Sequence, residues 1–159
     1  MALTKINNNT LSAVTTLPSA IATGKVLQVV SATDSTERAS TSSSYVTASN
    51  TLSVDITPSS TSSKIFIFAT TTGHANTSAS FRRYTIYRDA TNLGGSNGMQ
   101  IVYNENSADI INTVSLSYLD SPNSTSEITY QLYGKTASGS VYFSKNGVLS
   151  SITAYEIAG

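Results

Sequence analysis

The clearest pattern along the chain is the alternation of apolar and polar positions over residues 50 to 57. Leu52, Val54 and Ile56 occupy one set of alternate positions, and serine, aspartate and threonine occupy the other. Because successive side chains of a strand point to opposite faces, this segment predicts a β-strand with one buried face and one wet face. Residues 110 to 119 show the same alternation.

The segment of residues 64 to 71 is apolar on both faces. Ile65 and Ile67 share one face of the predicted strand, and Phe66 and Phe68 share the other. An antiparallel sheet with one solvated side needs only one apolar face, so the second must be buried in a sandwich or against a neighbouring subunit. We therefore take these four residues and Tyr155 as candidates for the core or for a subunit interface.

Further strands are predicted where β-branched and aromatic residues lie between turn signals. These segments are residues 25–30, 81–88, 99–104, 127–134, 140–144 and 148–157. The Asn146-Gly147 pair predicts a type I′ hairpin between the last two. No segment shows the 3.6-residue period of a helix. Eight or nine short strands predict an all-β, antiparallel β-sandwich domain over residues 25–159, with a jelly roll preferred; an immunoglobulin order, which lacks its usual Cys and Trp here, stays open.

Residues 1–24 follow neither period. Their apolar residues are scattered among threonine, serine and asparagine, and Pro18 and Gly24 mark the end of the segment. A segment of this kind buries little of its own apolar surface, so we expect an extended N-terminal attachment arm that orders on another surface; the alternative is a frayed terminus. The candidate docking residues of this arm are Leu3, Ile6, Leu11, Val14, Leu17 and Ile21.

The amino-acid composition limits which kinds of metal site, activity and partner the chain can have. Only 11% of the 159 residues are charged, where a soluble domain carries about 25%. The chain has 28 Ser and 23 Thr, one His, no Cys and no Trp. We therefore expect no thiolate or histidine metal centre, no cofactor and no enzymatic activity. Zero net charge argues against a nucleic-acid partner, and no apolar run is long enough for a membrane helix. A surface so poor in charge favours a homo-oligomer over the alternative of a monomer solubilised by hydroxyls.

A few polar residues are candidates for catalytic, ligand-binding or ion-binding sites. His74 is expected in a polar surface loop rather than in a catalytic group. Arg82 and Arg83 must point to opposite faces of one strand. Of the arginines 82, 83 and 88, one is expected to pair with an acid at a subunit contact or to cap a sheet edge, rather than to capture a ligand. Residues 104 to 109 offer carboxylates and amides for Ca²⁺ or a sugar, although these are also ordinary loop residues.

The tyrosines on predicted strands are expected in the core or in an interface, although exposed tyrosine also stacks on glycans. They are Tyr84, Tyr87, Tyr103, Tyr118, Tyr130, Tyr133 and Tyr155.

Several short motifs together resemble small virion structural proteins of tailed bacteriophages. The motifs are the opening MALTKI, residues 24–30 (GKVLQVV), 85–89 (TIYRD) with 92–94 (NLG), 119–122 (LDSP) and the ending 152–157 (ITAYEI). In such proteins a short N-terminal arm attaches to the particle, and a jelly-roll domain like the trimeric heads of the tumour-necrosis-factor and C1q type projects outward. The resemblance implies a homotrimer located in the virion.

Two roles fit this resemblance. A capsid decoration (cement) protein would dock on the major capsid protein or another virion protein through the arm and stabilise the shell. The alternative is a tail-fibre head that recognises a host-surface glycan or protein. The shortness of the arm and the absence of a repeat shaft before the domain favour the decoration protein. Under the resemblance, Ile65, Phe66, Ile67, Phe68 and Tyr155 would form the trimer interface or the core.

Overall fold

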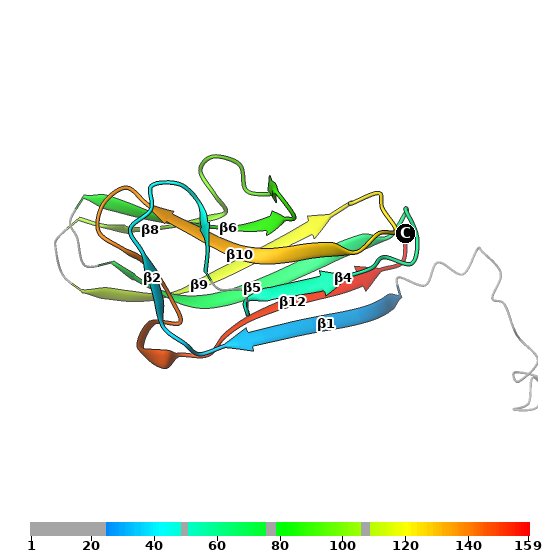
Figure 1. Cartoon of the computed structure of the whole chain (residues 1–159), viewed down its shortest axis with the longest axis horizontal. Coiled ribbons are helices and arrows are strands. Elements are labelled where there is room, and N and C mark those ends of the chain that lie inside the picture. The colour runs from blue at the N-terminus through cyan, green and yellow to red at the C-terminus, as the bar shows by residue number, and fades with distance from the viewer. Residues whose placement is uncertain (1–24, 49–50, 76–78, 106–108) are drawn as a thin grey trace, which may run out of the picture.

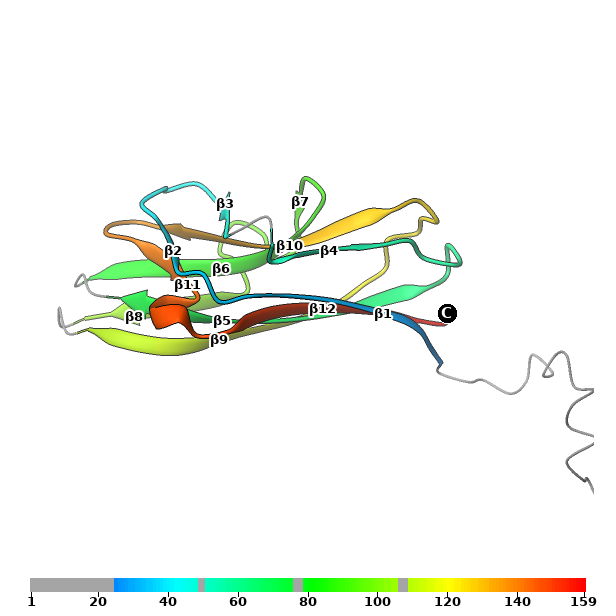
Figure 2. The same cartoon turned by 60° about the horizontal axis from the view of Figure 1, so that its bottom comes forward.

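Two antiparallel sheets face each other in the computed structural model, which describes residues 25–48, 51–75, 79–105 and 109–159 (Figure 1). Seen from the side, the sheets form two layers (Figure 2). The arm predicted over residues 1–24 lies outside the described residues. The strands predicted from alternation are all present, each with bounds within a few residues of the predicted ones.

The first layer is a four-stranded sheet. Its strands, in order across the sheet, are β1 (Val26–Asp34), β12 (Ser150–Ile157), β5 (Lys64–Ala75) and β9 (Ile110–Asp120). β5 is central, and it pairs with β9 along its full length.

The second layer is a six-stranded sheet built around β10 (Ile128–Thr136) and β6 (Ser80–Arg88). β10 also pairs with the short strands β3 (Val46–Thr47) and β4 (Ser53–Ile56). β6 also pairs with β7 (Thr91–Asn92) and β8 (Gln100–Asn104). β2, β3 and β7, of two or three residues each, are too short to give an alternating pattern in the sequence.

The hairpin predicted at Asn146-Gly147 is wrong. The strand before it, β11 (Val141–Phe143), pairs with β2 (Arg38–Ser40), whereas β12 pairs with β1 and β5. Residues Lys145–Gly147 form a short 3-10 turn, η1, in which Asn146 and Gly147 both have positive φ. The pair thus adopts the left-handed backbone that favours Asn-Gly, but it redirects the chain between sheets instead of folding it back on itself.

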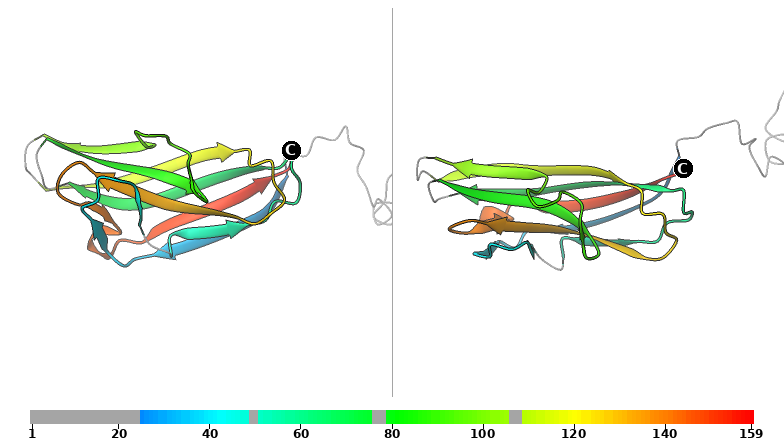
Figure 3. Two further views of the ribbon diagram at one scale, coloured as in Figure 1. Left: turned by 45° about the horizontal axis from the view of Figure 1, so that its top comes forward. Right: turned by 90° about the horizontal axis from the view of Figure 1, so that it is seen from above.

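The strand order is that of a jelly roll. Of the eight principal strands β1, β4, β5, β6, β8, β9, β10 and β12, the first pairs with the last, the second with the seventh, the third with the sixth and the fourth with the fifth. This nested pairing places the four successive pairs alternately in the two layers, and Figure 3 shows the two layers from further sides. It also separates the fold from the immunoglobulin order that the sequence left open.

The core lies between the layers and comes from the inward positions of the alternating strands. Ile67 and Ala69 of β5, Ile152 of β12 and Ile86 and Leu132 of the second sheet are all buried. Tyr84 and Tyr130 are fully buried as well, as expected for strand tyrosines, and each finds an acceptor for its hydroxyl. Burial of this kind contributes about 25 cal/mol for each Å² of apolar surface removed from water.

Polar side chains close the end of the core at which β1 begins and β12 ends, which we call the proximal end. The inward-facing row there is Gln28, Glu156, Ile65 and Asp120, one residue from each strand of the four-stranded sheet. Asp120 accepts two hydrogen bonds from the Arg88 guanidinium, at 2.9 and 3.0 Å, and one from the Tyr130 hydroxyl at 2.6 Å. Because Arg88 and Tyr130 belong to the other sheet, this cluster joins the two layers.

Glu156 is only 1% exposed, and its carboxylate is surrounded by donors. It accepts bonds from the backbone N–H and the hydroxyl of Ser59, from the Ser63 hydroxyl and from the Gln28 amide, at 2.6 to 3.0 Å. Burial alone raises the pKa of Glu156, but these hydrogen bonds outweigh it and lower the pKa to about 2. The carboxylate therefore fastens the β4–β5 connection to the end of the sheet.

The far end of the core is closed by hydroxyls. The Ser144 and Ser150 hydroxyls are 2.7 Å apart, the Ser150 hydroxyl donates to the Thr71 hydroxyl at 2.8 Å, and the Ser144 backbone N–H donates to that same oxygen at 3.0 Å. All three side chains are buried. Because buried hydroxyls need partners, mutual hydrogen bonding lets this Ser-rich chain bury serine without charge.

Removing the Glu156 charge should lower stability in a pH-dependent way. Because the pKa of Glu156 in the folded chain lies below its ordinary value of 4.5, the carboxylate stabilises the fold above about pH 4.5, and this contribution disappears as the pH falls toward 2. Glu156→Gln should cost about 1–3 kcal/mol at pH 7, and the difference from the wild type should shrink below pH 4.5. Denaturant unfolding at several pH values and one protein concentration measures both effects.

The matched control is Glu127→Gln, because Glu127 is exposed. It should change the free energy of unfolding by less than about 0.5 kcal/mol at every pH. A Glu156→Gln variant as stable as the wild type at pH 7 would contradict the role assigned to this carboxylate.

Candidate functional site

The outer face of the four-stranded sheet carries an unbroken apolar row at the proximal end. Val29, Tyr155, Phe66 and Leu119 lie opposite one another across β1, β12, β5 and β9. Val29 is 53% exposed and Leu119 is 50% exposed, and the rings of Phe66 and Tyr155 lie 6.1 Å apart. We call these four residues the apolar row. Phe68, which is 40% exposed, adjoins it one position further along the sheet.

Beyond Phe68 the outward positions of the same face carry hydroxyls, as far as the exposed Ile111 near the start of β9. Thr33, Ser151, Thr70 and Ser115 form the next outward row across the four strands. Hydroxyls also pair across strands: Ser31 and Thr153 lie 2.9 Å apart, and Thr70 and Ser151 lie 3.1 Å apart. The sheet therefore has one apolar half and one wet half on a single face, a contrast that scattered surface residues would not produce.

The interface candidates from the sequence divide between the two sides of β5. Ile65 and Ile67 point inward and are fully buried in the core, whereas Phe66 and Phe68 point outward. Tyr155 also lies on the outer face. The arm candidates Leu3, Ile6, Leu11, Val14, Leu17 and Ile21 lie outside the described residues.

The outer face of the six-stranded sheet is aromatic. Tyr87 and Tyr133 stack with ring centroids 4.0 Å apart, and Tyr45 meets Tyr87 edge-on at 6.2 Å. Burial raises the pKa of Tyr45 and of Tyr87. Phe81 and Tyr103 form a second aromatic pair at 4.6 Å. Several tyrosines that the sequence assigned to core or interface thus lie on an outer face.

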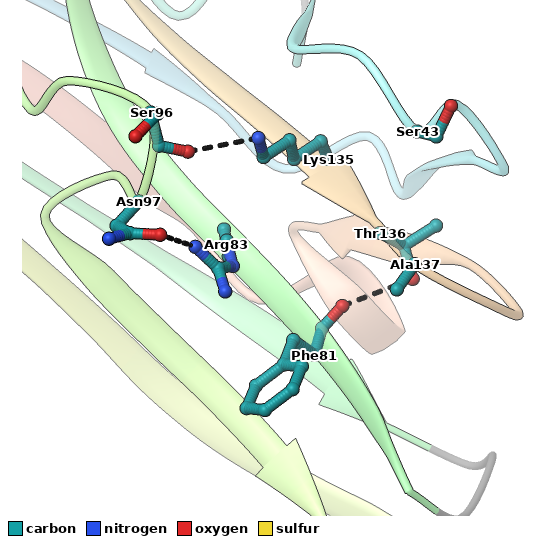
Figure 4. A pocket seen from close by; sticks show the side chains of 8 residues that line it. All are labelled: Ser43, Phe81, Arg83, Ser96, Asn97, Lys135, Thr136 and Ala137. Carbon is teal, nitrogen blue, oxygen red and sulfur yellow. Dashed lines mark hydrogen bonds between the residues drawn. The ribbon is translucent and has the colours of Figure 1, made fainter.

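A pocket of about 410 Å³ opens beside these rings (Figure 4). Its walls come from the β2–β3 connection, from β6, from the loop after β7 and from the end of β10. Two cations, Arg83 and Lys135, reach into it, and Phe81 flanks it. The lining residues are Ser43, Phe81, Arg83, Ser96, Asn97, Lys135, Thr136 and Ala137.

The loop of residues 93–99, which forms one wall, is held in place by Asn92. The Asn92 side-chain oxygen accepts bonds from the Thr85 hydroxyl at 2.6 Å and from the Gly94 N–H at 3.0 Å, and its amide donates to the Gly95 carbonyl at 2.7 Å. Gly98 has a φ of +74°, and a Cβ there would lie 2.7 Å from the Tyr84 carbonyl oxygen. Glycine is needed at this position because the loop passes so close to β6.

The three arginines have three different roles. Arg82 and Arg83 point to opposite faces of β6, as predicted. Arg82 is fully buried between the sheets and donates to the carbonyl groups of Ser80 and Ser140, while Arg83 faces the pocket. The arginine that pairs with an acid is Arg88, and its partner Asp120 belongs to the same chain instead of a neighbouring subunit.

His74 is not in a surface loop. It lies on β5, is 6% exposed, and its ring meets Tyr142 at 5.0 Å and the Asp109 carboxylate at 3.2 Å. The expectation of a loop is wrong because β5 continues four residues beyond the apolar segment, through a threonine-rich stretch that pairs with β9.

The ion site considered at residues 104–109 gains no support. Asn104 is buried and donates to the Ala75 carbonyl at 3.0 Å, and Asp109 contacts His74; residues 106–108 lie outside the described residues. Within the described part of the chain, no three His, Cys, Asp or Glu side chains lie together in a way that could hold a metal ion. No helix in that part is long and apolar enough to cross a membrane.

Sequence reasoning missed Glu156, Asp120 and Lys135. A signal for Glu156 exists, because it falls at an inward position of the alternation that includes Ile152 and Ala154. No local signal marks Lys135, since its position opposite Arg83 depends on the register of β10 against β6.

Comparison with known proteins finds distant structural neighbours only. No protein-family model and no curated protein matches the sequence. Among solved structures, the Gt strain of infectious bursal disease virus matches at 14% identity and a TM-score of 0.43, over 99% of this chain and 54% of that chain. The Gx strain of this virus matches at 15% identity and a TM-score of 0.43, over 84% of this chain and 37% of that chain. A mutant VP2 protein of this virus from T=1 particles matches at 15% identity and a TM-score of 0.40, over 82% of this chain and 36% of that chain. The chain thus spans about half or less of those chains, and its strand order rests on its own hydrogen-bonded pairs.

Reversing the charge of Lys135 should stabilise the fold relative to neutralising it. Arg83 and Lys135 are direct cross-strand partners, and like charges in such a pair repel. Lys135→Glu should therefore be more stable than Lys135→Gln by about 0.5 kcal/mol in low salt, and the difference should fall in high salt. Denaturant unfolding of the two variants tests this, and equal stabilities would show that Arg83 does not interact with a charge at position 135.

Proposed function

We propose that this chain is a virion structural protein, a homotrimeric decoration protein that docks on a shell through residues 1–24 and stabilises it. The observation that carries the proposal is the apolar row, exposed on the folded chain beside the point where residues 1–24 join β1. The resemblance of the sequence motifs to small virion proteins of tailed bacteriophages supports the same role.

The occupant proposed for the apolar row is another copy of the chain. The outward residues beside the apolar row on β5 and β12 are Lys64 and Ile157, which pair with each other, and of these Lys64 alone is charged. A partner surface without charge therefore fits this face. Three copies of one apolar row can meet around a three-fold axis, and each copy buries its row against the others. Residues 1–24 of each subunit would then leave the trimer at the proximal end, on the side of the shell.

The proposal also accounts for the arm. Residues 1–24 contain one charged residue, Lys5, and six scattered large aliphatic residues. Three identical arms attached to one trimer would bind a shell with an effective concentration that no single arm provides. Weak apolar contacts of each arm then add up to stable attachment without a large interface on the domain.

Replacing Phe68 tests the proposed trimer interface. Phe68→Ser removes an exposed apolar side chain, so the domain should keep its fold while the trimer dissociates at least tenfold more readily. Sedimentation measures the mass, and circular dichroism measures the fold. Ile101→Ser is the matched control, because Ile101 is 44% exposed on the outer face of the other sheet. Equal dissociation of both variants, or a monomeric wild type, would contradict the interface.

Deleting residues 1–24 tests the docking role. The truncated protein should remain a soluble folded trimer and should lose binding to capsids, as measured by co-sedimentation with particles that lack the protein. Capsid binding by the truncated protein would contradict docking through the arm. Labelling of host cells together with competition against adsorption would support the tail-fibre alternative instead.

A further inference from the structure

The pocket on the outer face of the six-stranded sheet contains an arrangement that stability alone does not explain. Lys135 of β10 and Arg83 of β6 are directly opposite each other in the strand register, and both point outward. Two like charges in such a pair destabilise a sheet. The chain has nine basic residues in 159, so placing two of them together departs from a composition that otherwise avoids charge.

No acid in the described part of the chain forms an ion pair with Arg83 or Lys135. All nine acidic residues fall within the described residues, and the cations that form ion pairs there are Arg38, His74, Arg88 and Lys145. Sites where a sequence departs from local stability rules are commonly functional. The missing negative charge is therefore expected from outside the chain.

Both cationic groups are held in place before any ligand arrives. The Arg83 guanidinium donates to the Asn97 side-chain oxygen and lies 5.3 Å from the centre of the Phe81 ring. The Lys135 ammonium donates to the Ser96 carbonyl at 2.9 Å and lies 4.4 Å from the centre of the Tyr45 ring. Figure 4 shows both side chains directed toward the 93–99 loop. Groups fixed in this way lose little entropy on binding a ligand.

The remaining lining indicates the kind of ligand. Ser43 and Asn97 supply hydroxyl and amide groups, which bind hydroxyl-rich ligands, and the 39%-exposed Phe81 ring offers an apolar surface for C–H groups. A saccharide presents both surfaces. Two cations suit one anionic group, whereas a nucleic-acid backbone needs a longer track of positive charge than this neutral chain has.

We infer that the pocket is a binding site for an acidic saccharide, with Arg83 and Lys135 clamping the carboxylate of one sugar unit and Phe81 packing against its ring. The inference does not rest on the proposed particle role, because the pocket and the apolar row lie on the outer faces of different sheets. Figure 2 shows these two sheets as separate layers. It gives the six-stranded sheet a surface for host or matrix polysaccharide, on the side away from the face that we propose for assembly.

The test is titration of the isotope-labelled full chain, followed by nuclear magnetic resonance, with glucuronate, with glucose and with acetate. Glucuronate should shift the amide signals of residues 81–83, 96–97 and 135–137 saturably. Glucose lacks the carboxylate and acetate lacks the ring, so each should bind at least tenfold more weakly. Phe81→Ala should weaken glucuronate binding and leave acetate binding unchanged.

The double variant Arg83→Gln/Lys135→Gln should lose at least tenfold in affinity for glucuronate, since each charge-assisted hydrogen bond is about twice as strong as a neutral one. Arg38→Gln/Lys64→Gln is the matched control, because it removes the same two charge types away from the pocket and should bind as the wild type does. Unfolding curves show whether each variant is folded.

Four outcomes would overturn the inference. Equal binding of glucose and glucuronate, or full affinity in the folded double variant, would show that the cations do not clamp a carboxylate. Acetate binding as tight as glucuronate would show that no sugar ring is recognised and would favour an acidic side chain of a protein partner. Loss of capsid binding by the double variant, without any saccharide binding by the wild type, would assign the pocket to a protein partner as well.

Discussion

The structure depends on one constraint, that β5 is apolar on both of its faces. Its inward residues Ile65, Ile67 and Ala69 are buried in the core, and its outward residues Phe66 and Phe68 remain at the surface of the folded chain. One sandwich can bury only the first set. Folding of a single chain therefore leaves an apolar surface that association would cover, and the proposed assembly follows from this remainder.

The small number of charged residues is reflected in the way the two ends of the core are closed. Polar side chains lie at both ends of the core. Hydroxyl groups lie at the far end, and two buried carboxylates, Glu156 and Asp120, lie at the proximal end. These acids fasten the sheets to each other and to a loop, so they are unavailable to the outer surface. The outer surface of the described residues then includes hydroxyl rows, an apolar row, an aromatic face and a cationic pocket.

Much of the fold was predictable because it is encoded locally. Alternation along residues 50–57 and 110–119 indicates strands and their buried faces, and the doubly apolar segment 64–71 indicates the central strand. Pairing over long distances is not encoded in this way. Asn146-Gly147 has the backbone of a hairpin turn but joins strands of different sheets, and Lys135 meets Arg83 only through the register of β10 against β6. The cationic pocket was invisible in the sequence for that reason.

The most direct measurement of the central claim is the reactivity of single cysteines on β9. The chain has no cysteine, so Leu119→Cys in the apolar row and Thr113→Cys on the hydroxyl half of the same face each provide a unique thiol on a side chain that is exposed in the isolated chain. If the row is covered in the native assembly, the thiol at position 119 reacts at least tenfold more slowly with an alkylating reagent than the thiol at position 113. Equal rates in the full-length protein would contradict the account.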